Sequence, residues 1–178
     1  MIYLDVHGTL FEYDYSLYNR KDVIWFSDGV HPFKDDKPLG YMPVIIKELV
    51  ERGIPIATLC RINKGSEIAQ EEQRADVLSN LDKFYSCIPK ERRYFCTGSK
   101  SEFLKTLKPD MKSNDILLED YQPNCIDWEQ AGGSTVKVLN GVNSLKTWIG
   151  FYIDPREDPE RAVNILTHIW AKLNRRFR

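Results

Sequence analysis

The chain has 178 residues, of which 42% are hydrophobic and 12% aromatic, and this composition excludes a disordered chain and suits one domain spanning residues 1–178. Its 25 Lys and Arg residues nearly balance its 26 Asp and Glu residues, so we expect no nucleic-acid partner, and local groups must hold any charged ligand. No apolar run reaches membrane-spanning length and no signal-peptide pattern is present, so we expect a soluble, cytoplasmic protein without a membrane partner. The four cysteines lack C-x-x-C spacing and fit reduced thiols of an intracellular protein.

The first predicted strand ends in an acid. Residues 2–4 are apolar without alternation, which is typical of a central strand covered on both faces. In an open α/β sheet the ligand crevice lies beyond the carboxyl ends of the strands, so the next residue, Asp5, is expected in that crevice. Gly8 permits a sharp turn, and Thr9 offers a hydroxyl and an N–H to an anion. On its own, an Asp and a Gly after a strand also fit a simple turn.

Residues 11–43 predict an insertion above the strand ends, because the segment is long, irregular and rich in turn residues. Its aromatic residues either attach the segment to the body of the protein or contact a substrate, and the sequence leaves both readings open. These residues are Phe11, Tyr13, Tyr15, Tyr18, Trp25, Phe26 and Phe33.

A change of hydrophobic period predicts a helix from residue 42 to about residue 53 and then a buried strand over 54–59. We expect Thr58 at the end of that strand, where its hydroxyl can donate to a phosphate oxygen without adding charge. Arg61 and Lys64 follow in one loop, either as anion ligands or as solvent-exposed residues.

Residues 65–83 read as a second helix capped by Gly65 or Ser66. A third strand spans either 84–88 or 93–96, and the pattern does not choose between them. A polar turn then leads to a helix over 102–107.

Lys100 lies at the junction between this turn and the helix, where a strand end and a helix N-terminus meet. It is one candidate for a basic residue near the strand ends. Lys105 and Lys112 are the alternatives, and each also fits a solvent-facing position.

An apolar strand beginning at residue 115 ends in two adjacent acids, Glu119 and Asp120. Neighbouring carboxylates at a buried strand end repel each other and need a compensating cation, for which Mg²⁺ is the usual choice. A fifth strand covers 134–140, and an amphipathic helix over 159–174 forms most of a C-terminal segment, residues 159–178. We expect this helix to pack on the sheet or on a second copy of the chain in a homodimer.

These segments together resemble the haloacid dehalogenase-like (HAD) phosphohydrolases over roughly residues 1–150. The run Asp5-Val-His-Gly-Thr-Leu10 resembles their first motif, Asp-x-Asp-x-Thr, except that His7 stands where the family carries its second Asp. Thr58, Lys100 and the pair Glu119-Asp120 match the second, third and fourth motifs in order. The continuation from Tyr121 to Gly133 resembles the 5'-nucleotidase and deoxyribonucleotidase branch.

The resemblance implies a three-layer, Rossmann-like parallel sheet with helices on both faces and a small cap over 11–43. It implies that Asp5 is the nucleophile and that Thr9, Thr58 and Lys100 bind phosphate. It also implies a Mg²⁺ site, with ligands from the Asp5 carboxylate, the backbone carbonyl of His7 and Asp120, and with Glu119 acting through water.

The activity implied is a Mg²⁺-dependent phosphatase or nucleotidase that acts on a small phosphorylated substrate, nucleotides included, through an aspartyl phosphate. His7 replaces the Asp that, in the family, protonates the leaving alcohol and then activates the hydrolytic water. Imidazole, which ordinarily titrates near pH 6.5, is able to make both proton transfers. The alternatives are an inactive relative that binds a phosphorylated ligand or a protein partner, and a phosphotransferase that uses the same residues.

Overall fold

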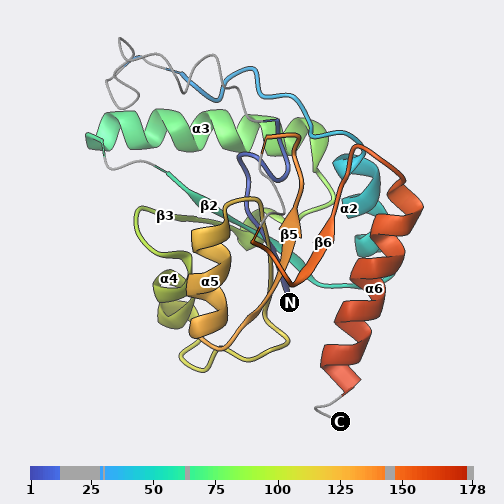
Figure 1. The fold of residues 1–178 in the computed structure, drawn as a ribbon. Helices are drawn as coiled ribbons and strands as arrows, with labels where there is room; N and C mark the ends of the chain where they lie inside the picture. The colour runs from blue at the N-terminus through green and yellow to red at the C-terminus, as the bar shows by residue number, and fades with distance from the viewer. Residues whose placement is uncertain (13–28, 30, 63–64, 143–146, 176–178) are drawn as a thin grey trace.

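The computed structural model describes residues 1–12, 29, 31–62, 65–142 and 147–175. Strands and helices alternate along most of this part of the chain (Figure 1). The elements are β1 (Ile2–Leu4), α2 (Met42–Glu51), β2 (Ile56–Arg61), α3 (Glu67–Phe84), a 3₁₀ turn (Lys90–Arg92), β3 (Arg93–Cys96), α4 (Lys100–Leu107), β4 (Ile116–Glu119), α5 (Gln122–Gln130), β5 (Ser134–Val138), β6 (Phe151–Ile153) and α6 (Pro159–Arg175).

The strands form one parallel sheet in the order β3-β2-β1-β4-β5-β6. The chain runs outwards from β1 to β3 on one side, then crosses to β4 and continues to β6 on the other side. The switch point of the sheet therefore lies between β1 and β4, where the crevice beyond the carboxyl ends of the strands receives ligands in folds of this kind. The expected α/β class with a parallel sheet is confirmed.

The sheet has helices on both faces, as expected. The larger buried cluster joins α2, α3 and α6 to one face, and the smaller cluster joins α4 and α5 to the other (Figure 1). The side chains of β1 explain both layers, because Ile2 and Leu4 enter the larger cluster while Tyr3 enters the smaller one. A strand buried on both faces must be apolar throughout, which is why residues 2–4 do not alternate in polarity.

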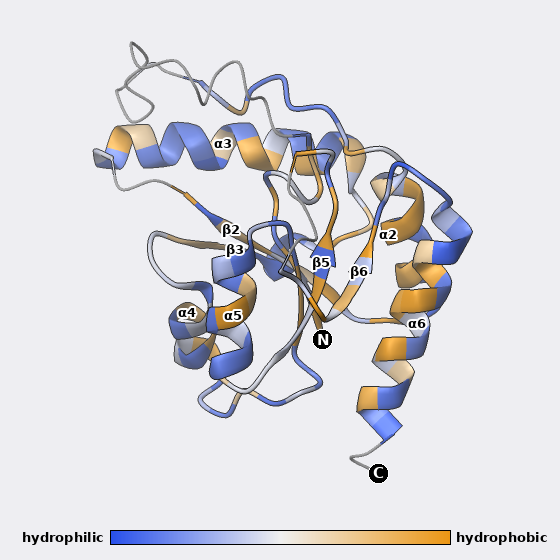
Figure 2. Cartoon of the chain, in the orientation of Figure 1, coloured by the Kyte–Doolittle hydropathy of each residue, from blue (hydrophilic) through white to orange (hydrophobic). Residues whose placement is uncertain are grey.

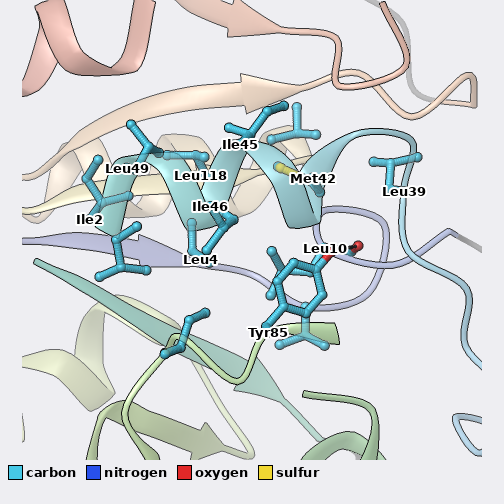
Figure 3. Packing of buried hydrophobic residues seen from close by; sticks show 14 of the residues in the cluster. Ile2, Leu4, Leu10, Leu39, Met42, Ile45, Ile46, Leu49, Tyr85 and Leu118 are labelled. Atoms are coloured by element: carbon cyan, nitrogen blue, oxygen red, sulfur yellow. Dashed lines mark hydrogen bonds between the residues drawn. The ribbon is translucent and has the colours of Figure 1, made fainter. Parts of the chain in front are cut away.

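Helix α2 lies over β1 and covers it with aliphatic side chains (Figure 3). Pro43 lies in its first turn, where a missing N–H costs nothing, and Gly53 follows its end at a φ of +75°. Bands of hydrophobic residues on α2 and α6 are visible in Figure 2, and these two helices contact each other. Each fully buried Leu or Ile of this cluster contributes about 1.5–3 kcal/mol relative to an exposed one.

Several boundaries differ from the sequence prediction. The third strand is 93–96, whereas Phe84 ends α3 and residues 85–88 form no strand. The second strand, predicted over 54–59 with Thr58 near its end, lies at 56–61, so Thr58 is inside β2 rather than at its tip. The helix expected from residue 102 begins at Lys100, because Ser99 caps it by accepting a hydrogen bond from the Glu102 N–H at 3.2 Å.

Two elements were not predicted, α5 and β6. Helix α5 carries Pro123 in its first turn and is followed by Gly132 and Gly133, which are start and stop signals that the sequence does contain. Strand β6 is three residues long and pairs with β5 at one end of the sheet. So short a strand gives too few residues for a pattern.

Much of the predicted insertion over 11–43 lies outside the described residues, including Tyr13, Tyr15, Tyr18, Trp25 and Phe26. Its described aromatic residues, Phe11 and Phe33, are buried in the larger cluster and attach the segment to the body. Helix α6 packs against that cluster, which fits the expectation of packing on the sheet, and a homodimer stays a prediction. In the described ranges, no helix combines the length and apolarity needed to cross a membrane, and all four cysteines are free thiols.

Candidate active site

Three buried carboxylates meet at the β1/β4 switch point. Asp5 follows β1, Glu119 ends β4 and Asp120 follows it, and one oxygen of each lies within 4.8 Å of the others. The sheet register explains the meeting, because Leu4 pairs with Leu118 and the Asp5 N–H donates to the Leu118 carbonyl at 3.0 Å. The three acids predicted at neighbouring strand ends are therefore close together.

Lys100 reaches this cluster from the first turn of α4. Its ammonium donates to Asp5 Oδ1 and, at 2.6 Å, to Glu119 Oε2, and the residue is only 4% exposed. Burial lowers the pKa of Lys100, but the charges of the two carboxylates outweigh this effect and raise the pKa above its ordinary value. The alternatives Lys105 and Lys112 are exposed.

Each oxygen of the Asp5 carboxylate has its own partner. Lys100 donates to Oδ1, and the fully buried Thr9 hydroxyl lies 3.4 Å from Oδ2, to which it donates a long hydrogen bond. The carboxylate is therefore oriented from two sides. Such fixation is useful for a group that must attack along one direction.

The second layer of contacts orients Glu119. Its Oε2 also accepts from Asn124 Nδ2 at 3.1 Å, and its Oε1 accepts from the Tyr121 N–H at 3.2 Å. Both partners belong to the start of α5. Burial raises the pKa of Glu119, and the Asp5 charge raises it further while Lys100 opposes the shift.

Two residues that the sequence did not single out hold Asp120. Asn140 Nδ2 donates to Asp120 Oδ2 at 2.9 Å and to the Gly8 carbonyl at 3.0 Å, and the Lys137 ammonium donates to the Asp120 carbonyl at 3.0 Å. Lys137 is 2% exposed although it lies within β5. A lysine between two buried valines was the signal available in the sequence.

Gly8 brings the loop after β1 against Asp120. Its φ is +83°, and a Cβ built on it would lie 2.5 Å from Asp120 Oδ2. Only glycine satisfies both the backbone conformation and this approach. The predicted turn at Gly8 is therefore part of the site.

The carboxylate cluster has the chemistry of a divalent cation site. Burial raises the pKa of Asp120 well above its ordinary value, and the charges of Asp5 and Glu119 add to the shift. The three carboxylates of this cluster have one ion-pair partner among the described residues, the buried ammonium of Lys100, so negative charge is in excess. Hard oxygen donors with excess negative charge are the ligands that Mg²⁺ prefers.

Thr58 is buried within β2. It pairs with Leu4, the β1 residue that precedes Asp5. Its hydroxyl is buried and has no hydrogen-bond partner among the described residues. Two residues further along β2, burial raises the pKa of the Cys60 thiol, and the charge of Asp5 raises it further.

His7 faces the insertion. Its Nδ1 lies 3.2 Å from Asp36 Oδ2, and its ring stacks on Phe33 with centroids 3.7 Å apart and planes inclined by 21°. Its Nε2 is buried without a hydrogen-bond partner in the described part of the chain. Of the basic loop residues, Arg61 is exposed at the end of β2, and Lys64 lies outside the described residues.

Comparison with known proteins adds to this geometry. No protein-family model matches the chain, and no curated protein matches its sequence. Among solved structures, the D,D-heptose 1.7-bisphosphate phosphatase from B. bronchiseptica, solved in complex with magnesium and phosphate, is similar with a TM-score of 0.58 and 11% sequence identity, over 94% of this chain and 97% of that one. At this identity the likeness shows the fold alone, so the chain shares the Rossmann-like α/β fold of that phosphatase.

Proposed function

We propose that the chain is a Mg²⁺-dependent phosphatase that hydrolyses a small phosphate monoester through a phosphoryl group carried on Asp5. The observation that carries the proposal is the buried Asp5 carboxylate, held by Lys100 and Thr9 beside two further carboxylates at the switch point of the sheet. The similar fold of a phosphatase solved with magnesium and phosphate supports it.

Asp5 and Asp120 would hold the metal directly, with Glu119 in support, since their oxygens lie within 4.8 Å of one another. The backbone carbonyl of His7 is the further ligand that the family resemblance implies. When bound, Mg²⁺ would supply positive charge beside the phosphate and so reduce repulsion between the dianion and the carboxylate.

The chain's own residues perform the bond changes. A carboxylate oxygen of Asp5 attacks phosphorus while the bond from phosphorus to the alcohol oxygen breaks, and the alcohol oxygen takes a proton from the imidazolium of His7. Water then attacks the phosphorus of the aspartyl phosphate, gives a proton to the neutral imidazole of His7, and releases phosphate with the Asp5 carboxylate restored. Lys100 balances the charge of Asp5 and of the transferring group throughout.

The phosphate contacts are proposed from the same geometry. Lys100 and Thr9 both contact the Asp5 carboxylate and are therefore the groups nearest to a phosphoryl group placed on it. Thr58, predicted from its motif position, pairs with Leu4 one residue before Asp5. Its buried hydroxyl has no hydrogen-bond partner among the described residues, and we include it among the proposed phosphate ligands.

The substrate class is proposed more narrowly from two resemblances. The run from Tyr121 to Gly133 resembles the nucleotidase branch, which favours nucleoside monophosphates. The similar solved structure is a sugar-bisphosphate phosphatase, which favours sugar phosphates. A panel containing both classes decides between them.

The test is turnover of p-nitrophenyl phosphate and of that panel with Mg²⁺ or with EDTA. We expect Mg²⁺-dependent release of phosphate, a loss of about 10³-fold or more in Asp5→Asn and in Lys100→Met, and near-parental activity in the control Lys105→Met. Rapid quenching and mass spectrometry should find the phosphoryl group on Asp5. Equal activity of Lys100→Met and Lys105→Met would show that the site lies elsewhere.

A further inference from the structure

Lys100 stands between two serines that share one acceptor. Ser99 Oγ donates to Asp127 Oδ2 at 2.8 Å, and Ser101 Oγ donates to the same oxygen at 2.7 Å. The two serine oxygens lie 2.9 Å apart. Because a hydroxyl has only one proton, both protons are used when both serines donate to the carboxylate. One oxygen of Asp127 therefore holds the residue before Lys100 and the residue after it.

These contacts fix the first turn of α4. Ser99 is the N-cap of this helix, and Ser101, which is only 3% exposed, lies in its first turn. With eight residues, α4 is about two turns long, and so short a helix depends on contacts from outside it. The carboxylate of Asp127 supplies such contacts and also places negative charge beside the helix N-terminus, where it is favourable.

Asp127 belongs to a helix that is itself anchored on β4. The fully buried Trp128 donates from Nε1 to the Asp115 carbonyl, directly before β4, at 3.0 Å. Asn124, three residues before Asp127 and therefore on the same face of α5, donates to Glu119 Oε2 at 3.1 Å. One face of α5 thus holds Glu119 and, through Asp127, the start of α4.

The position of the α4 backbone matters because the Lys100 ammonium makes two contacts at once. It donates to Asp5 beside the end of β1 and to Glu119 at the end of β4. A lysine side chain is a flexible stem of four carbons, so the place of its ammonium depends on where its backbone is held. A misplacement of about 1 Å in such a site can cost about 10²-fold in rate.

We infer that Asp127 is the positioning residue of Lys100: by holding the serines on either side of it, Asp127 keeps the ammonium on the carboxylates of the cluster; this rests on the proposed function. Asp127 acts through Lys100 and does not touch the substrate. Its loss should therefore lower the rate of turnover more than it weakens substrate binding. Residues 100 and 127 belong to different elements, and no pattern in the sequence links them.

Crystal structures test the position of Lys100 without any need for activity. In Asp127→Ala, we expect the distance from the ammonium to Glu119 Oε2 to rise from 2.6 Å to beyond about 4 Å. Asp127→Asn should keep the parental contact, because both serines donate to one oxygen and an amide oxygen can replace it. An ammonium that stays on both carboxylates in Asp127→Ala would overturn the inference.

Kinetics tests whether Asp127 acts through Lys100. With p-nitrophenyl phosphate and saturating Mg²⁺, Asp127→Ala should lower kcat by roughly 10- to 100-fold and change KM by less than about threefold. The conservative variant Asp127→Asn should restore kcat to within about threefold of the parent, because it keeps the acceptor oxygen. The control is Gln130→Ala, at an exposed position of the same helix, and it should follow the parent.

The double variant separates positioning from damage to the fold. When Lys100→Met is already present, adding Asp127→Ala should change kcat by less than about threefold, because the group that Asp127 positions is gone. A full loss of kcat in both backgrounds would show that Asp127 acts on the fold alone and would overturn the inference.

Ser101→Ala covers the case in which Asp127→Ala does not fold. Alanine suits a helix, and the change removes one of the two hydroxyls that Asp127 holds. We expect a smaller fall in kcat than in Asp127→Ala, and this fall should also disappear when Lys100→Met is present. A parental kcat in Ser101→Ala, with the ammonium in its parental place, would count against the inference in the same way.

The two proposals fail in different ways. If the parent releases phosphate from no ester of the panel, the proposed function is overturned, and the crystal structures still decide whether Asp127 sets the place of Lys100. If the parent is active and Asp127→Ala matches Gln130→Ala in kcat and in the place of the ammonium, the proposed function stands and the positioning role of Asp127 is overturned.

Discussion

Replacing Asp120 by Asn should stabilise the metal-free protein and remove its stabilisation by Mg²⁺. The change keeps the shape of the side chain, and an amide oxygen can still accept the hydrogen bond that Asn140 donates at 2.9 Å. What it removes is one of three carboxylates whose oxygens lie within 4.8 Å of one another. If removing a carboxylate makes the metal-free protein more stable, the carboxylates are placed for binding a cation and not for stability.

The size of the stability gain in Asp120→Asn follows from the distances between the carboxylates. Two unit charges at the 4.8 Å limit of this cluster repel each other by about 3.5 kcal/mol at an effective dielectric constant near 20. Asp120 faces two such charges, Asp5 and Glu119, and Lys100 offsets part of the repulsion. We therefore expect the free energy of unfolding in EDTA to rise by about 1–3 kcal/mol in Asp120→Asn.

The direction of the pKa shifts also sets how the stability of the metal-free protein depends on pH. The pKa values of Glu119 and Asp120 are raised in the folded protein, so the folded state holds more protons than the unfolded state above the ordinary carboxyl range. The stability of the metal-free parent therefore falls as the pH rises through these raised pKa values. The advantage of Asp120→Asn should be small near pH 4 and should grow towards neutral pH.

Urea unfolding in EDTA and in increasing Mg²⁺ measures both effects. The parent should gain about 2.7 kcal/mol when Mg²⁺ reaches one hundred times its dissociation constant, whereas Asp120→Asn should gain almost nothing. Asp110→Asn removes the same charge from an exposed position and should follow the parent. A variant that is less stable than the parent in EDTA, or equally stabilised by Mg²⁺, would refute the reasoning.

Two further predictions concern the loop after β1. Gly8→Ala should lower the free energy of unfolding by about 1–3 kcal/mol and weaken Mg²⁺ binding, because φ is +83° and the new Cβ meets Asp120. A Cβ at Gly98 would have nothing within 4 Å, so the control Gly98→Ala should follow the parent in the same urea and Mg²⁺ titrations. His7→Asp restores the family motif but places a carboxylate opposite Asp36, whose Oδ2 lies 3.2 Å from His7 Nδ1. Adding Asp36→Asn removes this repulsion. The double variant should therefore be more stable and more active than the sum of the two single changes, by about 1 kcal/mol or more. Strictly additive unfolding free energies would show that the two side chains do not interact.

The sequence by itself determined the α/β class and the acids that stand at the ends of β1 and β4. Asp5 and the pair Glu119-Asp120 were predictable because unbroken apolar runs mark buried parallel strands, whose carboxyl ends meet at one edge. Lys100 was predicted from its place at the start of a helix together with its match to the third motif of the resembled family. These are local signals, and local periodicity is what a single sequence records well.

The tertiary structure alone decided which side chains meet. Lys100 reaches Asp5 across 95 residues of sequence, and Asn140 reaches the Gly8 carbonyl across 132. The level of Thr58 was decided by the sheet register, which pairs it with Leu4, the residue before Asp5, and no local pattern fixes that register. The contact of Asp36 with His7 likewise depends on how the insertion packs against α3, which the packed fold determines and the residues near either position do not.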